Sequence, residues 1–549
     1  MIACVPHPQT VAISLTLAAF ALAGIAKLAF DPIVTWPDFW YFVERAELQS
    51  LRGEQFQAAW AAIPAARREW VEPWANGFWP LGYPLLLAFF RRIIGDWAGA
   101  ARAISWLSAL SYAALTGTLA ARLRGRSLGA LAFCLTLSHP SLLWWSQAES
   151  TDLLAAALQM GALTLLVTHP LSRRATLVLA GLTLGVAYLV RYQALLVFLA
   201  LLVWLLMQPA PAVLGRLRAG GLMLVGFILA ALPQLLASQI AVGLPFYDLQ
   251  WKNVWFFSFS TRGWWSWHSM PEAGSILSVV LSNPRHLAQH YVTEVVLAPL
   301  TSIPPLWRPM ILGLGMLSLP RLLRFWRCRR GLRKTGNEIE AYRRSILPLG
   351  LLVAAALILS SALMRVTDRG LLPALWAQTG AVAWAFQSIE DRASARKGWQ
   401  QTLRTLAARA LPALVVVAGF AGHISLLQQS AQAHNATRAV SATLRQAGLT
   451  DARQALSSGF TLYDLPSERR YSTFMWDLAR EPVDAADLVS LASQAGYRWL
   501  VLESLYSPSM FPLVRQMIDD PPGDTRVLLR IDRPHKVVVL SLPAPGVPR

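Results

Sequence analysis

The sequence RRATLVLAGLTLGVAYLVRYQALLVFLALLVWLLM, residues Arg173 to Met207, holds two apolar runs that are separated by one charged residue, Arg191. Basic residues precede the first run, and neither run carries a charge of its own. The same alternation of apolar runs and short basic clusters extends from Val11 to Gly422. A helix needs about 20 mostly apolar residues to cross a bilayer core of roughly 30 Å. The pattern therefore predicts a polytopic membrane protein built from apolar helices.

The composition supports this prediction. The 549 residues are 55% hydrophobic and 14% charged, with a mean hydropathy of +0.42, which excludes a soluble secreted enzyme. The formal net charge is +19, but the arginines lie in clusters between apolar runs, as in cytoplasmic loops. No nucleic-acid partner is expected, because no binding motif or basic face is visible. Cys4, Cys134 and Cys328 are too scattered to form a disulfide framework or a metal site.

Charge also sets the expected topology. The opening residues MIACVPHPQT contain no Lys or Arg, which favours an uncleaved first span over a signal peptide. The stretch Trp79 to Arg92 is too short to span and contains two prolines, so we expect a juxtamembrane helix on the outer side. Arg122, Arg124 and Arg126 then fall in the cytoplasm. These choices predict a cytoplasmic N-terminus and an extracytoplasmic C-terminus.

About eleven spans are expected. They are Val11–Phe30, Leu107–Ala121, Leu128–Trp145, Leu153–Val167, Leu177–Val190, Ala194–Met207, Leu222–Val242, Leu306–Leu319, Ile346–Leu363, Leu371–Phe386 and Leu411–Ile424. The predicted fold is thus an all-α polytopic membrane protein with a small C-terminal α/β soluble domain.

The domain organisation follows from the same pattern. Residues 1–424 form the expected transmembrane domain, with a first extracytoplasmic loop at 31–78 and an aromatic outer loop at 243–300. Residues 425–549 form the expected extracytoplasmic α/β domain. Its predicted elements are helices at 431–446 and 485–495 and strands in WLVLE and KVVVLSL. No internal repeat, Walker loop or metal-spacing motif is visible, so nothing supports ATP-driven transport.

Polar residues at the predicted outer surface are the candidates for chemistry. Asp38 follows the first span, where a carboxylate can act as general base toward a hydroxyl or amide, or can be a solvated loop acid. Glu149 and Asp152 lie in a turn between two spans. They can contact an acceptor or a metal, or Ser150 or Thr151 can simply cap the next helix with an acid in its first turn.

Two arginines are candidates for binding phosphate. Arg191 lies between two apolar runs, where its guanidinium can bind a phosphate in a bidentate fork or can extend to the membrane surface. Arg365 and Arg369 form a second outer basic pair beside Asp368, and a local ion pair with Asp368 is the alternative.

These residues, in this order, resemble the type C glycosyltransferases, in the branch of the protein O-mannosyltransferases and aminoarabinose transferases called glycosyltransferase family 39. The resemblance covers roughly Val11 to Gly422. The residues that carry it are Asp38, Tyr41, Ala46 and Glu47, the Pro-x-Gly-Tyr-Pro-Leu-Leu-Leu-Ala stretch Pro80 to Ala88, Ser146 to Glu149, Arg191, Leu232-Pro233, Gly243 to Phe246 and Arg369 to Pro373.

The resemblance implies a donor sugar on polyprenyl phosphate or diphosphate and a catalytic base at Asp38. It implies that Arg191 and Arg369 bind the donor phosphate, and that Glu149 and Asp152 match an acidic position that contacts acceptor or metal. A divalent metal cofactor stays open. Trp79-Pro80-Leu81 departs from the family's paired prolines. The protein mannosyltransferases carry a second acid next to the first-loop Asp, and Asp38 has no such neighbour, which argues against protein O-mannosylation.

We therefore expect a cell-membrane enzyme that passes a sugar from a polyprenyl-phosphate donor to a lipid, glycan or protein acceptor on the extracytoplasmic face, with inversion. The alternatives are a lipid-linked glycan polymerase or ligase, a transporter or flippase, and a scaffold. A transporter would carry ionisable residues near mid-membrane in repeated halves, whereas the charges here cluster at the predicted outer edge.

Overall fold

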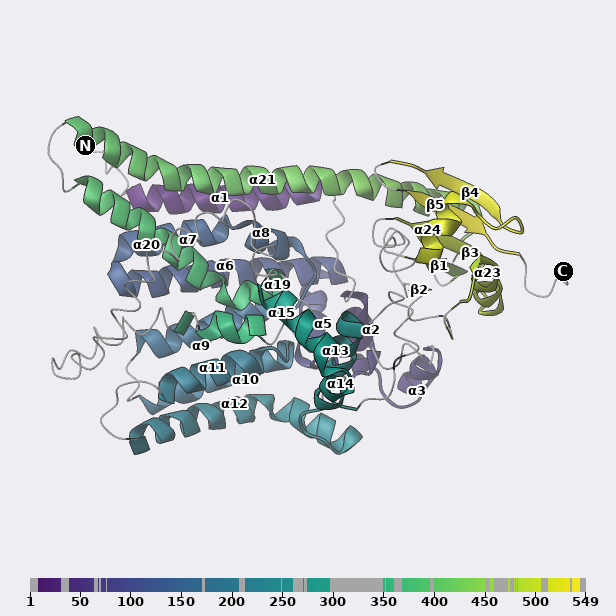
Figure 1. Ribbon diagram of the computed structural model, residues 1–549, viewed down its shortest axis with the longest axis horizontal. Helices are drawn as coiled ribbons and strands as arrows, with labels where there is room; N and C mark the ends of the chain where they lie inside the picture. Colours follow the sequence, from purple (N-terminus) through teal and green to yellow (C-terminus); the bar gives the residue numbers. More distant parts are fainter. Residues whose placement is uncertain are drawn as a thin grey trace. The chain divides into compact units, whose positions relative to one another are not determined.

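The computed structural model is mostly helical, with a small sheet near the C-terminus (Figure 1). It describes residues 8–30, 39–63, 68, 71–75, 77–169, 173–206, 213–247, 249–259, 270, 274–296, 349–350, 352–359, 368–394, 399–450, 454–458, 472–473, 478, 480, 482–504, 512–533 and 536–543.

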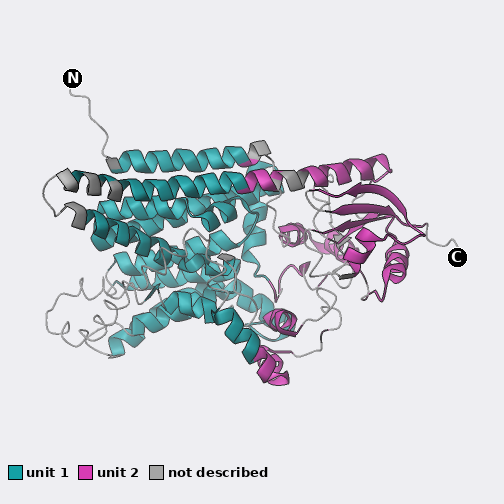
Figure 2. Cartoon of the chain, turned by 45° about the horizontal axis from the view of Figure 1, so that its top comes forward, with its two compact units in different colours: residues 1–26, 79–247, 288–425 teal, residues 27–78, 248–287, 426–549 magenta. Residues whose placement is uncertain are grey.

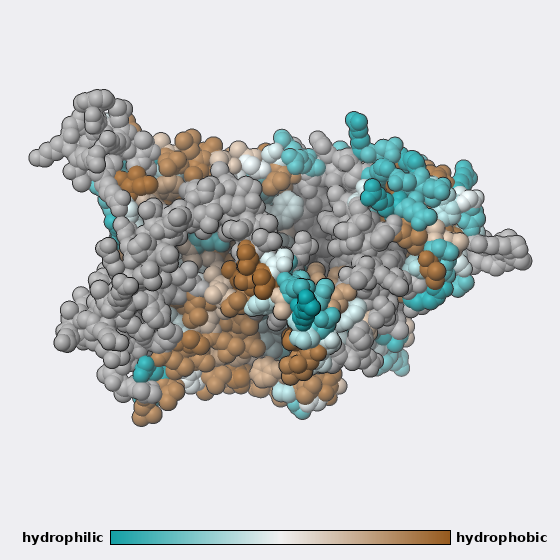
Figure 3. All heavy atoms as spheres, in the orientation of Figure 1, coloured by the Kyte–Doolittle hydropathy of each residue, from teal (hydrophilic) through white to brown (hydrophobic). Residues whose placement is uncertain are grey.

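Four described helices are long and apolar enough to cross a membrane. They are α1 (Pro8–Phe30), α6 (Trp97–Arg124), α12 (Val213–Val242) and α21 (Trp399–Gln446). Exposed leucine, isoleucine and valine side chains occur along α12 from Leu214 to Ile240. In Figure 3 apolar side chains gather over this region of the surface. Side chains of this kind on the outside of a helix suit contact with lipid rather than water.

The expected span Leu128–Trp145 is broken into two helices. The helices α7 (Arg126–Leu137) and α8 (Pro140–Gln147) meet at an angle of 57°, and together they count as a fifth candidate span. Pro140 begins α8, where its missing N–H costs no hydrogen bond, and Nδ1 of His139 accepts from the Ser141 N–H at 3.2 Å. The expected span therefore stays a candidate, but this cap starts a new helix inside its apolar run, which the sequence pattern did not predict.

Shorter apolar helices complete this part of the bundle. They are α9 (Asp152–Thr168), α10 (Arg174–Val190) and α11 (Ala194–Leu206). The helices α10 and α12 approach closely at glycines: a Cβ on Gly181 would lie 2.0 Å from the Met223 carbonyl oxygen, and one on Gly226 would lie 2.2 Å from that of Val178. Small residues of this kind let membrane helices pack with their backbones in near contact.

The other described helices do not combine the length and the apolar composition of these candidate spans. The helix α5 (Gly82–Ile94) has 13 residues and is followed by the C-cap Gly95, so it is too short to span, as predicted, while its juxtamembrane position stays a prediction. The remaining described helices before α21 are α2 (Phe39–Ser50), α3 (Gly53–Ala61), α13 (Gln250–Phe259), α14 (Ile276–Ser282), α15 (Pro284–Val296), α19 (Asp368–Leu371), the 3₁₀ helix η2 (Leu372–Ala374) and α20 (Leu375–Ser394).

The number of eleven spans stays a prediction. The expected span Leu306–Leu319 lies outside the described residues, and of Ile346–Leu363 only residues 349–350 and 352–359 are described. The expected helices Leu411–Ile424 and 431–446 form one helix, α21. The change from apolar to polar composition suggested a break there, but residues 425–430 include no proline or glycine that would end a helix.

The C-terminal sheet has five strands in the order β2-β1-β3-β5-β4. They are β1 (Ala455–Ser457), β2 (Ser472–Thr473), β3 (Trp499–Glu503), β4 (Arg526–Ile531) and β5 (Val537–Ser541). The strand β1 pairs in parallel with β2 and β3, whereas β5 pairs antiparallel with β3 and β4. The predicted strands in WLVLE and KVVVLSL are confirmed as β3 and β5.

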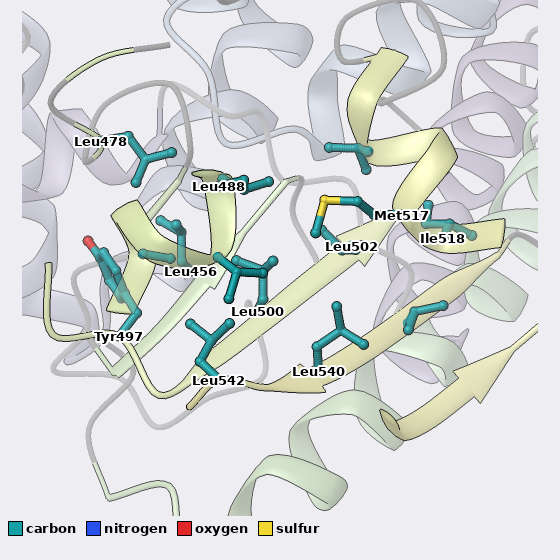
Figure 4. Packing of buried hydrophobic residues seen from close by; sticks show 14 residues of the cluster. Leu456, Leu478, Leu488, Tyr497, Leu500, Leu502, Met517, Ile518, Leu540 and Leu542 are labelled. Carbon is teal, nitrogen blue, oxygen red and sulfur yellow. The ribbon is translucent and has the colours of Figure 1, made fainter. Parts of the chain in front are cut away.

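Side chains alternate between the two faces of this sheet. On one face, Leu500 and Leu502 of β3 and Leu540 of β5 pack against α23 (Ala485–Gln494) and α24 (Pro512–Asp519) (Figure 4). On the other face, Trp499 and Val501 of β3 and two valines of β5 pack against Ala436, Val440 and Leu444 of α21. Burial of both faces explains why β3 and β5 are apolar except at their last residues.

The chain separates into two compact units (Figure 2). The first contains residues 1–26, 79–247 and 288–425, and the second contains residues 27–78, 248–287 and 426–549. The domain boundaries at 424 and 425 and the loop ranges stay predictions.

Candidate functional site

The turn between α8 and α9 is the most polar buried segment of the first unit. Glu149, Ser150 and Thr151 are each no more than 3% exposed. Hydrogen bonds to α6 and α1 hold this turn. The Ser105 hydroxyl of α6 donates to the Ala148 carbonyl at 2.7 Å, and the Gln147 side chain donates to the Ala23 carbonyl of α1 at 3.3 Å. These contacts hold two carboxylates at the end of the apolar helices.

Glu149 pairs with an arginine from α6. The Nε of Arg102 lies 2.9 Å from Oε1 of Glu149, whose side chain is 1% exposed while that of Arg102 is 36% exposed. A charged carboxylate with so little access to water requires a partner of this kind. The arginine therefore compensates a buried charge while part of its own side chain reaches solvent.

Asp152 pairs with Arg191. Nη1 of Arg191 lies 2.5 Å from Oδ1 of Asp152, and it donates to the Thr151 hydroxyl at 3.3 Å. Asp152 is the first residue of α9, and Arg191 follows the last residue of α10, so the pair joins two neighbouring helix ends. The Asp152 side chain is 2% exposed and that of Arg191 is 24% exposed. We name Arg102, Glu149, Asp152 and Arg191 the arginine–acid cluster.

Tyr83 lies close to this cluster. It is the second residue of α5 and is fully buried. Burial raises the pKa of its hydroxyl, and the negative charges of Glu149 and Asp152 raise that pKa further. The preceding residue, Gly82, packs against the end of α10, where a Cβ would lie 2.6 Å from the Leu189 carbonyl oxygen. The motif around Tyr83 thus places a neutral hydroxyl near both acids.

Arg369 belongs to a neighbouring segment. It lies in α19, is partly exposed, and precedes Gly370, whose carbonyl accepts from the Gln193 side chain at 3.0 Å. Gln193 follows Arg191 by two residues, so one hydrogen bond connects the two segments that carry the predicted phosphate-binding arginines. The side chain of Asp368 lies outside the described residues, which leaves the local ion pair untested.

The geometry of the arginine–acid cluster bears on the alternative roles that the sequence leaves open for Asp152 and Arg191. Thr151 precedes α9 without a side-chain capping hydrogen bond, so Asp152 serves an ion pair in addition to any interaction with the helix dipole. Arg191 contacts Asp152 and Thr151 instead of only extending to the surface. Asp38 lies outside the described residues, and its role as base stays a prediction.

A metal would have to be held by the two acids and further ligands. Among the residues that the structure describes, no three His, Cys, Asp or Glu side chains lie together in a group that could hold a metal ion. Glu149 and Asp152 are each bound to an arginine, which supplies the positive charge that a cation would otherwise bring. The described part of the cluster therefore does not fit a metal.

Sequence reasoning missed Arg102. It lies near the start of α6, outside the segments that carry the family resemblance, and no motif marks it. One signal was available: α6 begins after Asp96, which caps it, and Arg102 is the first basic residue of the helix and precedes its apolar part. A charge at the edge of a span is a candidate partner for an acid at the same edge.

Comparisons with known proteins were made with the sequence and with the structure. No protein-family model and no curated protein sequence matches the chain. Solved structures do match, at low identity. The structure of ArnT from Cupriavidus metallidurans in the apo state is 15% identical, with a TM-score of 0.55, and the match covers 98% of this chain and 99% of that one.

Two further structures extend this likeness. ArnT from Cupriavidus metallidurans bound to undecaprenyl phosphate is 14% identical, with a TM-score of 0.54 and coverage of 98% and 99%. The archaeal oligosaccharyltransferase AglB from Archaeoglobus fulgidus, in complex with an inhibitory peptide and a dolichol-phosphate, is 12% identical, with a TM-score of 0.51 and coverage of 91% of this chain and 72% of that one.

The chain therefore has the fold of the type C glycosyltransferases, and it is a multi-pass membrane protein. The match to ArnT covers 98% of this chain.

Proposed function

We propose that this protein is a membrane glycosyltransferase that uses a sugar linked to a polyprenyl phosphate. The observation that carries the proposal is the arginine–acid cluster, which places a partly exposed Arg191 on a buried carboxylate at the ends of apolar helices. The similar protein ArnT has been solved with undecaprenyl phosphate, and AglB with a dolichol-phosphate. A lipid carrier of this kind has a tail that suits the bilayer and a phosphate that suits arginine.

The surroundings of Arg191 and Arg369 differ, and both fit the binding of a phosphate. Arg191 is anchored through one nitrogen to Asp152, while its side chain remains 24% exposed. Arg369 lies in the segment that Gln193 connects to the Arg191 turn. Together they would bind the phosphate oxygens of the donor and stabilise the negative charge that develops as the phosphate leaves.

The chemistry is an inverting displacement. An acceptor hydroxyl or amide attacks the anomeric carbon of the donor sugar, a bond forms between them, and the bond from that carbon to the phosphate oxygen breaks. The attacking group loses its proton to the carboxylate of Asp38, the proposed general base. The lipid phosphate leaves with the electron pair, and Arg191 and Arg369 bind it.

Glu149 and Asp152 have supporting roles in this proposal. Each holds an arginine through an ion pair, so that the positive charges are oriented before the donor binds. The acceptor is a lipid, a glycan or a protein, and the reaction takes place at the extracytoplasmic face, where the charge pattern of the sequence places the cluster and the C-terminal domain.

The proposal is tested by sugar transfer. Membranes with and without the protein are incubated with labelled sugars on polyprenyl phosphate and on polyprenyl diphosphate, and labelled products are separated by size. We expect transfer from at least one donor, inhibited by added undecaprenyl phosphate. Long labelled chains would instead indicate a lipid-linked polymerase or ligase. Absence of transfer from every donor would contradict the proposal and favour a transporter or scaffold.

A further inference from the structure

Gln159 is a buried polar residue that the proposed function does not use. It lies in α9 and is 2% exposed. Its amide nitrogen and its amide oxygen are both buried, and neither has a hydrogen-bond partner among the described residues. An amide in the apolar interior of a membrane helix bundle is costly when it is not satisfied. Such a group calls for a ligand that can both donate and accept.

The position of Gln159 on α9 points to that ligand. Gln159 follows Asp152 by seven residues, which is two turns, so the two side chains lie on one face of the helix about 10.5 Å apart along its axis. The turn between them presents Ala155 and Ala156 to the same face, and both are buried. Side chains of a helix lean toward its N-terminus. A Gln159 side chain with this lean extends its amide over two small residues in the direction of Asp152.

A direct hydrogen bond is beyond the reach of this side chain. A glutamine side chain of four bonds of roughly 1.5 Å each extends about 5 Å at most, which leaves about half of the separation open. Water is the ligand that fits: a buried water bridges polar groups that cannot meet, and it both donates and accepts. Ala155 and Ala156, which lie between the two polar residues, carry no polar side-chain atom that would compete for it.

The need for this water arises when the donor binds. In the resting protein the carboxylate of Asp152 has Arg191 as its charge partner. An arginine that turns its guanidinium toward a donor phosphate gives up part of that interaction, and Asp152, 4% exposed, has little access to bulk solvent. A buried charge that loses its partner is strongly destabilised. A water held by Gln159 would donate to the carboxylate in place of Arg191.

We propose that Gln159 is a positioning residue that holds one or two water molecules against Asp152 and thereby allows Arg191 to bind the lipid phosphate. The inference rests on the proposed function, because it requires a phosphate that competes for Arg191. The inferred water site extends the arginine–acid cluster into the helix bundle. It lies on the face of α9 formed by Asp152, Ala155, Ala156 and Gln159.

The test compares binding and stability in the full chain. Undecaprenyl phosphate is titrated into the purified protein in phosphatidylcholine nanodiscs, and thermal unfolding is measured without the lipid. Gln159→Met keeps the length of the side chain and removes its hydrogen bonds. We expect binding to weaken about three- to tenfold, the effect of one hydrogen bond, while the unfolding midpoint without lipid does not fall.

Two controls separate this role from a merely structural one. Thr164→Val removes a different buried polar group of α9, a hydroxyl that already donates to the Met160 carbonyl at 2.8 Å, and it should leave binding unchanged. In an Asp152→Asn background, where no carboxylate charge needs solvation, Gln159→Met should have no further effect on binding.

Several outcomes would overturn the inference. Equal binding by the wild type and Gln159→Met would do so, as would an equal loss in the Asp152→Asn background. A wild-type protein that binds no undecaprenyl phosphate would remove the proposed function together with this inference, whereas wild-type binding that Gln159→Met leaves intact would remove the inference alone.

Discussion

Arg191 connects the fold to the proposed chemistry at the scale of a single side chain. It follows the last residue of α10 and binds Asp152 of α9. Its position between two apolar runs identified it from the sequence, because a charge there must be paired or functional. Asp152 was also a candidate from the sequence. The ion pair between the two could not be predicted, because neither segment indicates which helices are neighbours in the bundle.

Substitution of Arg191 should weaken donor binding. Arg191→Gln removes a charged hydrogen bond to phosphate, a loss of about 1.5–3 kcal/mol, or roughly ten- to a hundredfold in donor KM. Arg191→Lys keeps the charge without the bidentate fork and should lie between. The measurement is the donor dependence of sugar transfer. Arg174→Gln, at the opposite and exposed end of the same helix, is the matched control; equal effects of both changes would contradict the role.

Arg102 should matter for stability through Glu149. Arg102→Met leaves a carboxylate that is 1% exposed without its charge partner, which should cost about 1–3 kcal/mol of stability. The thermal unfolding midpoint in detergent should fall, and Glu149→Gln added to Arg102→Met should restore most of it. Unchanged unfolding of the single variant would show that this pair contributes little.

At the scale of elements, the sequence predicted which stretches form helices better than it predicted the residues at which those helices begin and end. The apolar runs around Arg191 became α10 and α11 as expected, because each run is uniform and is bounded by a charge. The break between α7 and α8 was missed, since Pro140 and His139 lie inside an apolar stretch and only the capping geometry shows that a new helix begins. Composition likewise suggested a break in α21 that its backbone does not have.

The contact between α10 and α12 gives a test at this scale. Gly181→Ala places a Cβ against the Met223 carbonyl, so the helices must separate, at a cost of about 1–3 kcal/mol. Gly221→Ala on α12 has open space around its Cβ and should be neutral or slightly stabilising. Unfolding of both variants in detergent measures the difference. Equal midpoints would mean that α10 and α12 do not pack through these glycines.

At the scale of the whole molecule, the fold is shared with a solved structure. The similarity to ArnT covers 98% of this chain although only 15% of the residues are identical, so the two chains share a fold with few residues in common. The sequence resemblance reached the same fold through a few residues such as those from Pro80 to Ala88. The catalytic assignment of Asp38 depends on that resemblance alone, because Asp38 lies outside the described residues.

The proposed role of Asp38 is therefore the point to measure first. Labelled sugar transfer from polyprenyl-phosphate donors is compared in membranes with the wild type, Asp38→Asn and Asp31→Asn at matched expression, with Asp31 as another acid of the same outer loop. Loss of a general base should reduce turnover by about 10²–10⁴-fold. The account predicts that Asp38→Asn abolishes transfer while Asp31→Asn retains it. Equal transfer by all three proteins would contradict an Asp38-dependent glycosyltransferase.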